Sequence, residues 1–269
     1  MDVFDVKYFV KTEFFGYARE LKLHVESKLK PANQPSNKFV IFSTGRSGST
    51  LLVNMLNTNP QVHCTGELLR SKNIDPHKVI KISEQLCSKE VFGFKLLTYQ
   101  LLHLQDTITD KKKFLKELVN NDYRIIYLER KNSLLQALSV LYAMQRNVWH
   151  YKNEAKTKDT KITLPPDRLA NMIHEFEQFK IKEQALLEGL PYMYLNYEVD
   201  LEQTANLKAT VHKLEDYLNL SLQAPKLNLK KVTPKKLSSF LSNYQEISKF
   251  ILSQKKYDQF TSPILDTMF

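Results

Sequence analysis

The chain has 269 residues, a length that fits one large α/β domain or two small ones. Hydrophobic residues make up 42% and charged residues 25%, which excludes a disordered or low-complexity chain. The net charge of +10 favours a polyanion as partner, such as nucleic acid, an acidic membrane or a nucleotide with several phosphates, or it serves solubility alone.

The chain's two cysteines and its N-terminus bear on its location. Cys64 and Cys87 match neither a metal motif nor a disulfide framework, so we expect reduced structural thiols and a cytoplasmic protein. Asp2 and Asp5 stand where a signal peptide carries basic residues, so no secretory signal is expected. No apolar run of about 18 residues occurs, so no membrane span is expected.

The first third of the chain predicts a helix, a strand and a second helix. Residues 3–29 carry apolar side chains at helical spacing, and residues 31–37 form a linker. Residues 39–42 are a continuous apolar run, Phe-Val-Ile-Phe, which is typical of a buried parallel strand. A glycine-containing loop at 43–49 leads into a helix. This helix is expected to end at residues 57–60, because proline cannot continue it.

Strands and helices then alternate to the end of the chain. We expect strands at 91–97, 123–128 and 192–197, and helices at 77–88, 110–120, 133–150, 167–189, 203–218 and 237–253. A polar surface loop is expected at 152–162 and a lysine-rich segment at 226–236. The alternation predicts an α/β protein with a three-layer, P-loop-like fold, in which helices flank a central parallel sheet. No domain boundary is evident, so we expect a single domain over residues 1–269 with an added N-terminal helix.

The loop between the first strand and the second helix has the features of an anion site. N–H groups in the first turn of a helix lack partners, and the helix dipole adds about half a positive charge there. Gly45 and Gly48 let the backbone approach an anion closely, and Ser49 and Thr50 add hydroxyl donors. Arg46 adds a guanidinium that suits tetrahedral oxyanions. We expect this loop to bind a phosphate-bearing ligand, the alternative being a turn that binds nothing.

The loop departs from the nucleoside-triphosphatase pattern G-x-x-x-x-G-K-[ST]. With Gly48 on its second glycine, Ser43 replaces the first glycine and Ser49 replaces the lysine. Without that lysine, the clamp on the β- and γ-phosphates is weakened. The loop is therefore predicted to hold a phosphate, but not that of ATP as a phosphoryl donor.

A second anion site is predicted just past the strand at 123–128. Arg130 follows the carboxyl end of that strand, where ligands bind in open α/β sheets, and Ser139 lies nine residues on. Both side chains are predicted to converge on a second phosphate near the first. The alternative is a surface arginine and an ordinary helix serine.

The two elements together resemble the sulfotransferases that use 3′-phosphoadenosine 5′-phosphosulfate (PAPS). The loop of that family reads approximately [KR]-[ST]-G-[ST]-[ST], which is residues 46–50 here, and its second element is a strand, an arginine and a serine eight or nine positions later. The chain most resembles the bacterial branch with trehalose 2-sulfotransferase and nodulation-type enzymes, whose R-x-[DN]…Q-A-[VL]-S pattern matches Arg130, Asn132 and residues 136–139. TGELL at 65–69, YLNYEVDLEQT at 194–204 and KKLSSFLSNYQEI at 235–247 agree more weakly. The resemblance covers about residues 38–252.

The resemblance implies a cofactor, a reaction and binding residues. The reaction is in-line transfer of a sulfuryl group to a hydroxyl or amine of a small acceptor, such as a carbohydrate or secondary metabolite, and needs no metal. The loop would hold the 5′-phosphosulfate, and Arg130 and Ser139 would hold the 3′-phosphate. The cofactor-binding residues so implied are Gly45, Arg46, Ser47, Gly48, Ser49, Thr50, Arg130, Ser139, Lys230 and Lys231.

Four residues are candidates for the chemistry itself. Arg46 would neutralise the leaving phosphate, and Glu67 is the first candidate for the general base. Its alternative role is a salt bridge or a cap. Lys95, near the end of its strand, would steady the sulfuryl oxygens, the alternative being a solvated lysine. His103 is a further candidate base, as are His63 and His150.

Other functions stay open at this point. A P-loop kinase of small molecules is one, and a non-catalytic module that binds phosphate or nucleic acid is another. For the sulfotransferase we expect a small-molecule acceptor as partner, neither nucleic acid nor a membrane, and a monomer or homodimer. The sequence does not identify the acceptor.

Overall fold

The computed structural model describes residues 6–146, 161–221 and 236–254, and side chains from residue 16 onward. These residues form two units, the first comprising residues 1–129 and 182–226 and the second residues 130–181 and 227–269. Each unit is described by itself below. The single domain over residues 1–269 stays a prediction, and the loop expected at 152–162 lies outside the described residues except for its last two.

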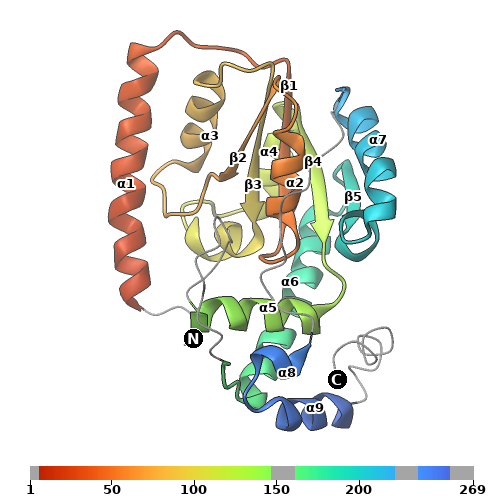
Figure 1. The fold of residues 1–269 in the computed structure, drawn as a ribbon. Helices are drawn as coiled ribbons and strands as arrows, with labels where there is room; N and C mark the ends of the chain where they lie inside the picture. Colours follow the sequence, from red (N-terminus) through yellow and green to blue (C-terminus); the bar gives the residue numbers. More distant parts are fainter. Residues whose placement is uncertain (1–5, 147–160, 222–235, 255–269) are drawn as a thin grey trace. The chain divides into compact units, whose positions relative to one another are not determined.

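The first unit is built on a five-stranded sheet in which every neighbouring pair of strands is parallel (Figure 1). The strand order is β2-β3-β1-β4-β5. The strands are β1 Asn37–Ser43, β2 Val62–Glu67, β3 Val91–Leu97, β4 Tyr123–Glu129 and β5 Tyr192–Asn196. Because all strands run the same way, their carboxyl ends lie along one edge, where ligands bind in open α/β sheets. The predicted α/β fold with a central parallel sheet is confirmed.

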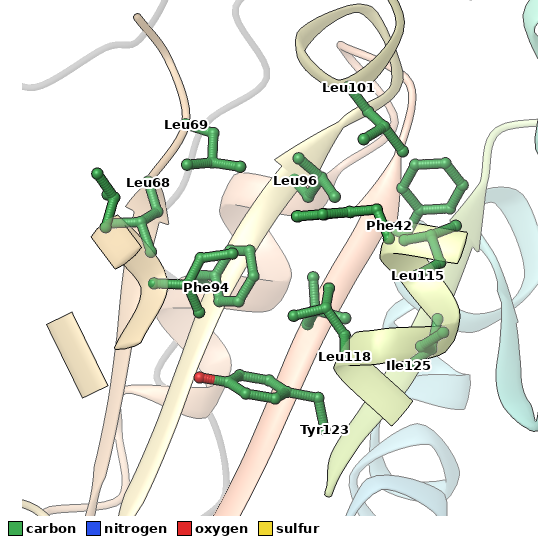
Figure 2. Packing of buried hydrophobic residues seen from close by; sticks show 14 of the residues in the cluster. Phe42, Leu68, Leu69, Phe94, Leu96, Leu101, Leu115, Leu118, Tyr123 and Ile125 are labelled. Carbon is green, nitrogen blue, oxygen red and sulfur yellow. The ribbon is translucent and has the colours of Figure 1, made fainter. Parts of the chain in front are cut away.

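Helices cover both faces of this sheet. On one face α2 Ser49–Leu56 and α7 Leu207–Leu218 pack over a cluster of buried side chains. On the other face lie α3 Pro76–Gln85 and α4 Lys111–Asn120, over the cluster that Figure 2 shows. Helix α1 Val6–Leu29 lies beside α3 (Figure 1). Asp75 and Asp110 begin α3 and α4 by accepting hydrogen bonds from the N–H groups of Lys78 and Lys113.

The apolar run in β1 follows from its central place in the sheet. Phe39 and Ile41 belong to the cluster under α2 and α7, whereas Val40 and Phe42 belong to the cluster under α3 and α4. Both faces of the strand are buried, so neither set of alternating positions can be polar. Strand β2 lies at the edge and buries only alternate residues at its start, which is why no continuous apolar run marks it.

Helix α1 is fastened to the segment that follows β2. A Cβ atom on Gly16 would lie 2.0 Å from the backbone oxygen of Lys72, so the helix approaches this segment as closely as glycine allows. Arg19 donates to the backbone oxygen of Leu68. The Glu20 carboxylate accepts from the N–H groups of residues 74 and 75 at 2.8 and 3.1 Å. The added helix therefore stabilises residues 68–75, which come directly after Glu67.

Two π-helical turns lie at the carboxyl ends of strands in this unit. Turn η1 Gln100–Leu104 follows β3, and η2 Tyr197–Leu201 follows β5. A short 3₁₀ turn, η3 Thr204–Asn206, precedes α7, so the helix expected from residue 203 begins at Leu207. The sequence predicted neither π turn, because a π turn has no characteristic hydrophobic period.

The described residues of the second unit lie mainly in helices. The unit contains α5 Ser133–Arg146, the first part of α6 Pro166–Leu187, α8 Leu237–Phe240 and α9 Tyr244–Ser253. The single helix expected over residues 237–253 is divided, because Asn243 exchanges hydrogen bonds with the backbone of Leu164 and a parallel bridge joins Ile162 to Leu241. None of the described helices is long and apolar enough to cross a membrane.

Candidate functional site

The loop after β1 contains two residues in the left-handed backbone region. Arg46 and Gly48 adopt positive φ angles of 60° and 86°. The Ser47 hydroxyl turns back and donates to the oxygen of Thr44 at 2.9 Å, so it supports the loop itself. Helix α2 begins with Gly48 as its N-cap, and glycine has no side chain that could accept from the first N–H groups of the helix. The strand, loop and helix predicted from the sequence are all present.

Tyr197 packs against the loop at Gly48. A Cβ atom on Gly48 would lie 2.4 Å from Cδ2 of Tyr197, so position 48 needs glycine for space as well as for its φ angle. Tyr197 is the first residue of η2, directly after β5. Sequence analysis did not name it as a site residue. Its place at the carboxyl end of a predicted strand, at the edge where ligands bind, was the available signal.

Glu67, Lys95 and Thr50 meet beneath the first turn of α2. Lys95 Nζ lies 3.0 Å from Glu67 Oε1 and 3.4 Å from Thr50 Oγ1. The Lys95 side chain is 6% exposed and that of Glu67 is 26% exposed. The alternative of a solvated lysine is therefore wrong, because this ammonium is buried and paired. The salt bridge given as the alternative role of Glu67 is present, so its role as a base stays a prediction.

A β-bulge turns Glu67 toward this group. Thr65 pairs with Phe94, but Glu67 rather than Gly66 pairs with Lys95, so Gly66 is an extra residue in β2. Side chains in a strand alternate between the faces of the sheet. Without the extra residue, Glu67 would face away from Lys95 and α2. The inserted glycine thus places the carboxylate on the face of the sheet that α2 covers.

The second oxygen of Glu67 also has a partner. Gln100 Nε2 donates to Glu67 Oε2 at 2.8 Å, and the Gln100 side chain comes from η1 at the end of β3. The carboxylate is thus held by a cation on one oxygen and by a neutral amide on the other. Sequence analysis missed Gln100, because no motif or periodicity marks it.

The histidine candidates lie in different places. His103 is an exposed residue of η1, and its pKa is lowered by desolvation and then by the positive charges of Lys182 and Lys111. His63 lies near the start of β2 and stacks on Phe92, whereas Glu67 ends that strand. His150 lies outside the described residues. The roles of these histidines stay predictions.

The residues predicted to hold the 3′-phosphate belong to other parts of the chain. Arg130 directly follows β4, and Ser139 is buried on α5. Both belong to the second unit, so their approach to the loop stays a prediction. Lys230 and Lys231 lie outside the described residues.

Cysteine and metal chemistry add little to this site. Cys64 and Cys87 are buried and free, and burial raises the pKa of both thiols, although Lys95 opposes the shift at Cys64. Protonated thiols of this kind are inert structural residues. Within the described ranges, no group of three or more His, Cys, Asp or Glu side chains is placed to hold a metal ion.

A family model matches part of the chain. Residues 83–173 match the model described as Stf0 sulphotransferase. This segment is about a third of the chain and contains Lys95, Gln100, Arg130 and Ser139, but not the loop or Glu67. The match supports a relationship to the sulfotransferases, while the trehalose and nodulation-type branch stays a prediction. No curated protein matches the chain.

Three solved structures of similar arrangement are sulfotransferases. A sulfotransferase from Alicyclobacillus acidocaldarius is 9% identical, with 86% of this chain and 96% of that chain covered and a TM-score of 0.46. The sulfotransferase domain of the Synechococcus PCC 7002 olefin synthase is 15% identical, with 72% and 77% covered and a TM-score of 0.42. Mouse sulfotransferase SULT7A1, complexed with PAP, is 12% identical, with 91% and 89% covered and a TM-score of 0.42.

Proposed function

We propose that this protein is a sulfotransferase that moves the sulfuryl group of PAPS to a hydroxyl or amine of a small-molecule acceptor. The observation that carries the proposal is the buried Lys95 ammonium, shared between Glu67 and Thr50 at the open first turn of α2. A cation, a carboxylate and the N–H groups at the start of a helix are parts that can serve the transfer of an anionic group. The sulfotransferase family match includes the strand that carries Lys95.

The loop would bind the 5′-phosphosulfate end of the donor. N–H groups of α2 and the Arg46 guanidinium supply charge-assisted hydrogen bonds, each of which contributes about 1.5–3 kcal/mol. Lys95 supplies, from a neighbouring strand, the ammonium that residue 49 lacks. We assign the 3′-phosphate to Arg130 and Ser139, and Lys230 and Lys231 to the cofactor as well. Several such contacts account for binding at about micromolar concentration without a metal.

The transfer would proceed in line. The acceptor oxygen or nitrogen attacks sulfur, and the bond from sulfur to the bridging oxygen of the 5′-phosphate breaks. Arg46 neutralises the charge that develops on that oxygen, and the Lys95 ammonium stabilises the negative charge on the sulfuryl oxygens. Glu67 accepts the proton of the acceptor, and its partial exposure lets an acceptor reach it. The products are the sulfated acceptor and adenosine 3′,5′-bisphosphate (PAP).

One observation also favours a second function, a P-loop kinase of small molecules. Lys95 places an ammonium next to Thr50, where it could serve ATP phosphates in place of the missing loop lysine. The kinase would use Mg²⁺ and the triphosphate, whereas the sulfotransferase needs neither. Nucleotide binding therefore separates the two functions.

Calorimetry followed by an acceptor screen tests the proposal. PAP should bind at about micromolar concentration or tighter in EDTA, and adenosine 5′-monophosphate more weakly. Sulfur-labelled PAPS is then incubated with trehalose, amino sugars and simple phenols, and label should appear in at least one acceptor. Tighter binding of ATP with Mg²⁺, with transfer of its γ-phosphate, would establish the kinase instead. Binding of oligonucleotides alone, with steep salt dependence, would indicate a nucleic-acid-binding module.

We also propose where the enzyme works and on what. The resemblance to the trehalose and nodulation-type branch favours a carbohydrate acceptor.

A cytoplasmic location is supported by the two free, buried cysteines, since such thiols persist in reducing compartments. Whether the enzyme is a monomer or a homodimer can be measured by light scattering.

A further inference from the structure

The side chain of Gln100 is buried and hydrogen-bonded at both ends of its amide. Its exposed fraction is 0%. Oε1 accepts from the N–H of Leu97 at 3.0 Å, and Nε2 donates to Glu67 Oε2 at 2.8 Å. An N–H donor can meet only the amide oxygen, and a carboxylate only the amide NH₂. The two bonds therefore set a single orientation of the amide.

The backbone around Gln100 is equally constrained. Gln100 is the first residue of the π turn η1, and π turns occur often at functional sites. The next residue, Leu101, packs in the same cluster as Leu68 and Leu69, which follow Glu67 (Figure 2). The turn that carries Gln100 and the segment that carries Glu67 are thus held to a common apolar core.

Gln100 and Lys95 bind different oxygens of one carboxylate. Lys95 holds Oε1 but also contacts Thr50 at the mouth of the proposed anion site. A bound phosphosulfate would attract the Lys95 ammonium away from Glu67. Gln100 carries no charge, so an arriving anion does not draw it away. A carboxylate held by Gln100 keeps its place when Lys95 turns to the donor.

We propose that Gln100 is a positioning residue that holds the Glu67 carboxylate in the orientation needed to accept the proton of the acceptor. The inference rests on the proposed function. Alignment of a base with its proton contributes to the rate, because a displaced base loses the short hydrogen bond through which the proton moves. Because both ends of its amide are buried and bonded to protein groups, we expect Gln100 to affect turnover and not the binding of the donor.

The chain offers a matched control in Gln105. Its side chain is also 0% exposed, and its Nε2 donates to the oxygens of Leu69 and Ser71 at 3.0 and 2.7 Å. It therefore resembles Gln100 in burial and bonding but does not touch Glu67. Loss of either glutamine destabilises the fold, and only loss of Gln100 releases the carboxylate.

A double-mutant cycle on turnover tests the inference, with labelled PAPS and the best acceptor of the panel named above. Gln100→Leu should lower kcat by about 10–100-fold and change the Kd for PAP by less than about twofold. In the Glu67→Gln background the same change should lower kcat by less than about twofold, because no base remains to position. Gln105→Leu should have the same effect in both backgrounds.

Two further measurements keep the inference testable if Gln100→Leu does not fold, and they separate positioning of Glu67 from a purely structural role of Gln100. Gln100→Glu keeps the shape and the bond from Leu97 but places a second carboxylate beside Glu67, and it should also lower kcat. A crystal structure of either Gln100 variant with PAP should show the Glu67 carboxylate displaced. Equal effects of Gln100→Leu with and without Glu67, or an undisplaced carboxylate, would overturn the inference alone. Absence of transfer by the unaltered protein would overturn the proposed function and this inference with it.

Discussion

Glu67 and Lys95 form an ion pair across neighbouring strands, with Oε1 3.0 Å from Nζ. The pair exists because Gly66 is an extra residue in β2 that brings the carboxylate into register with the lysine. The lysine is buried whereas the glutamate is partly exposed, and the lysine also contacts Thr50. The charge of Lys95 is therefore divided between a candidate base and a candidate anion site, and the predictions below separate these two roles.

Glu67→Gln should lower turnover by about 10²–10⁴-fold, because the variant cannot accept a proton. The same change should tighten the binding of PAPS, since Lys95 no longer pairs with a carboxylate. Stopped-assay rates and calorimetry without acceptor measure the two effects.

Glu84→Gln is the matched control for this change. Glu84 pairs with Lys38 at 3.2 Å near the start of β1, at the opposite end of the strands from the loop. This variant should keep both the rate and the affinity for PAPS. Near-normal turnover of Glu67→Gln would move the role of base to His103.

Lys95→Met should weaken the binding of PAPS by about tenfold or more, since the variant loses one charge-assisted hydrogen bond to the donor. The affinity for PAP, which lacks the sulfuryl group, should fall less. Calorimetry with both nucleotides gives the comparison. Equal losses for the two would show that Lys95 contacts the phosphate and not the sulfuryl group. No loss for either would place Lys95 outside the donor site.

Gly48→Ala should destabilise the protein by about 1–3 kcal/mol, because a φ angle of 86° is strained for alanine and its Cβ would overlap the Tyr197 ring. Gly45→Ala is the control, since a Cβ atom there would meet nothing within 4 Å. Urea unfolding measures both. In Gly48→Ala/Tyr197→Ala the overlap is removed, and the remaining loss reports the φ strain. A Gly48→Ala protein as stable as the control would contradict the close packing of Tyr197.

Arg130→Ala should weaken the binding of PAP strongly, by about tenfold or more, because a guanidinium fork to the 3′-phosphate is lost. Adenosine 5′-monophosphate has no 3′-phosphate, so its affinity should stay the same in this variant. Calorimetry with the two nucleotides provides the test. An unchanged affinity for PAP would show that Arg130 does not hold the 3′-phosphate.

Local features of the chain were predictable because neighbouring residues specify them. The apolar run at residues 39–42 predicts a strand buried on both faces, and the glycine-containing segment between this run and the next apolar stretch predicts a loop that leads into a helix. The alternation of strands and helices then leads to a parallel sheet. The two interpretations of Lys95 could not be separated by local features. The residues around a lysine near a strand end do not show whether a partner on the next strand buries its ammonium or whether water solvates it.

The sequence by itself determined four of the five strands in the sheet and most of the described helices, because each depends on residues a few positions apart. The tertiary structure decided which side chains contact one another: Glu67 contacts Lys95 and Gln100, and Lys95 contacts Thr50. It also decided that the Tyr197 ring packs against Gly48. These contacts join different strands and turns, and the Glu67 pair depends on one inserted residue in β2. Hydrophobic periodicity specifies which face of a strand is buried, but a one-residue bulge reverses the face on which a polar side chain lies.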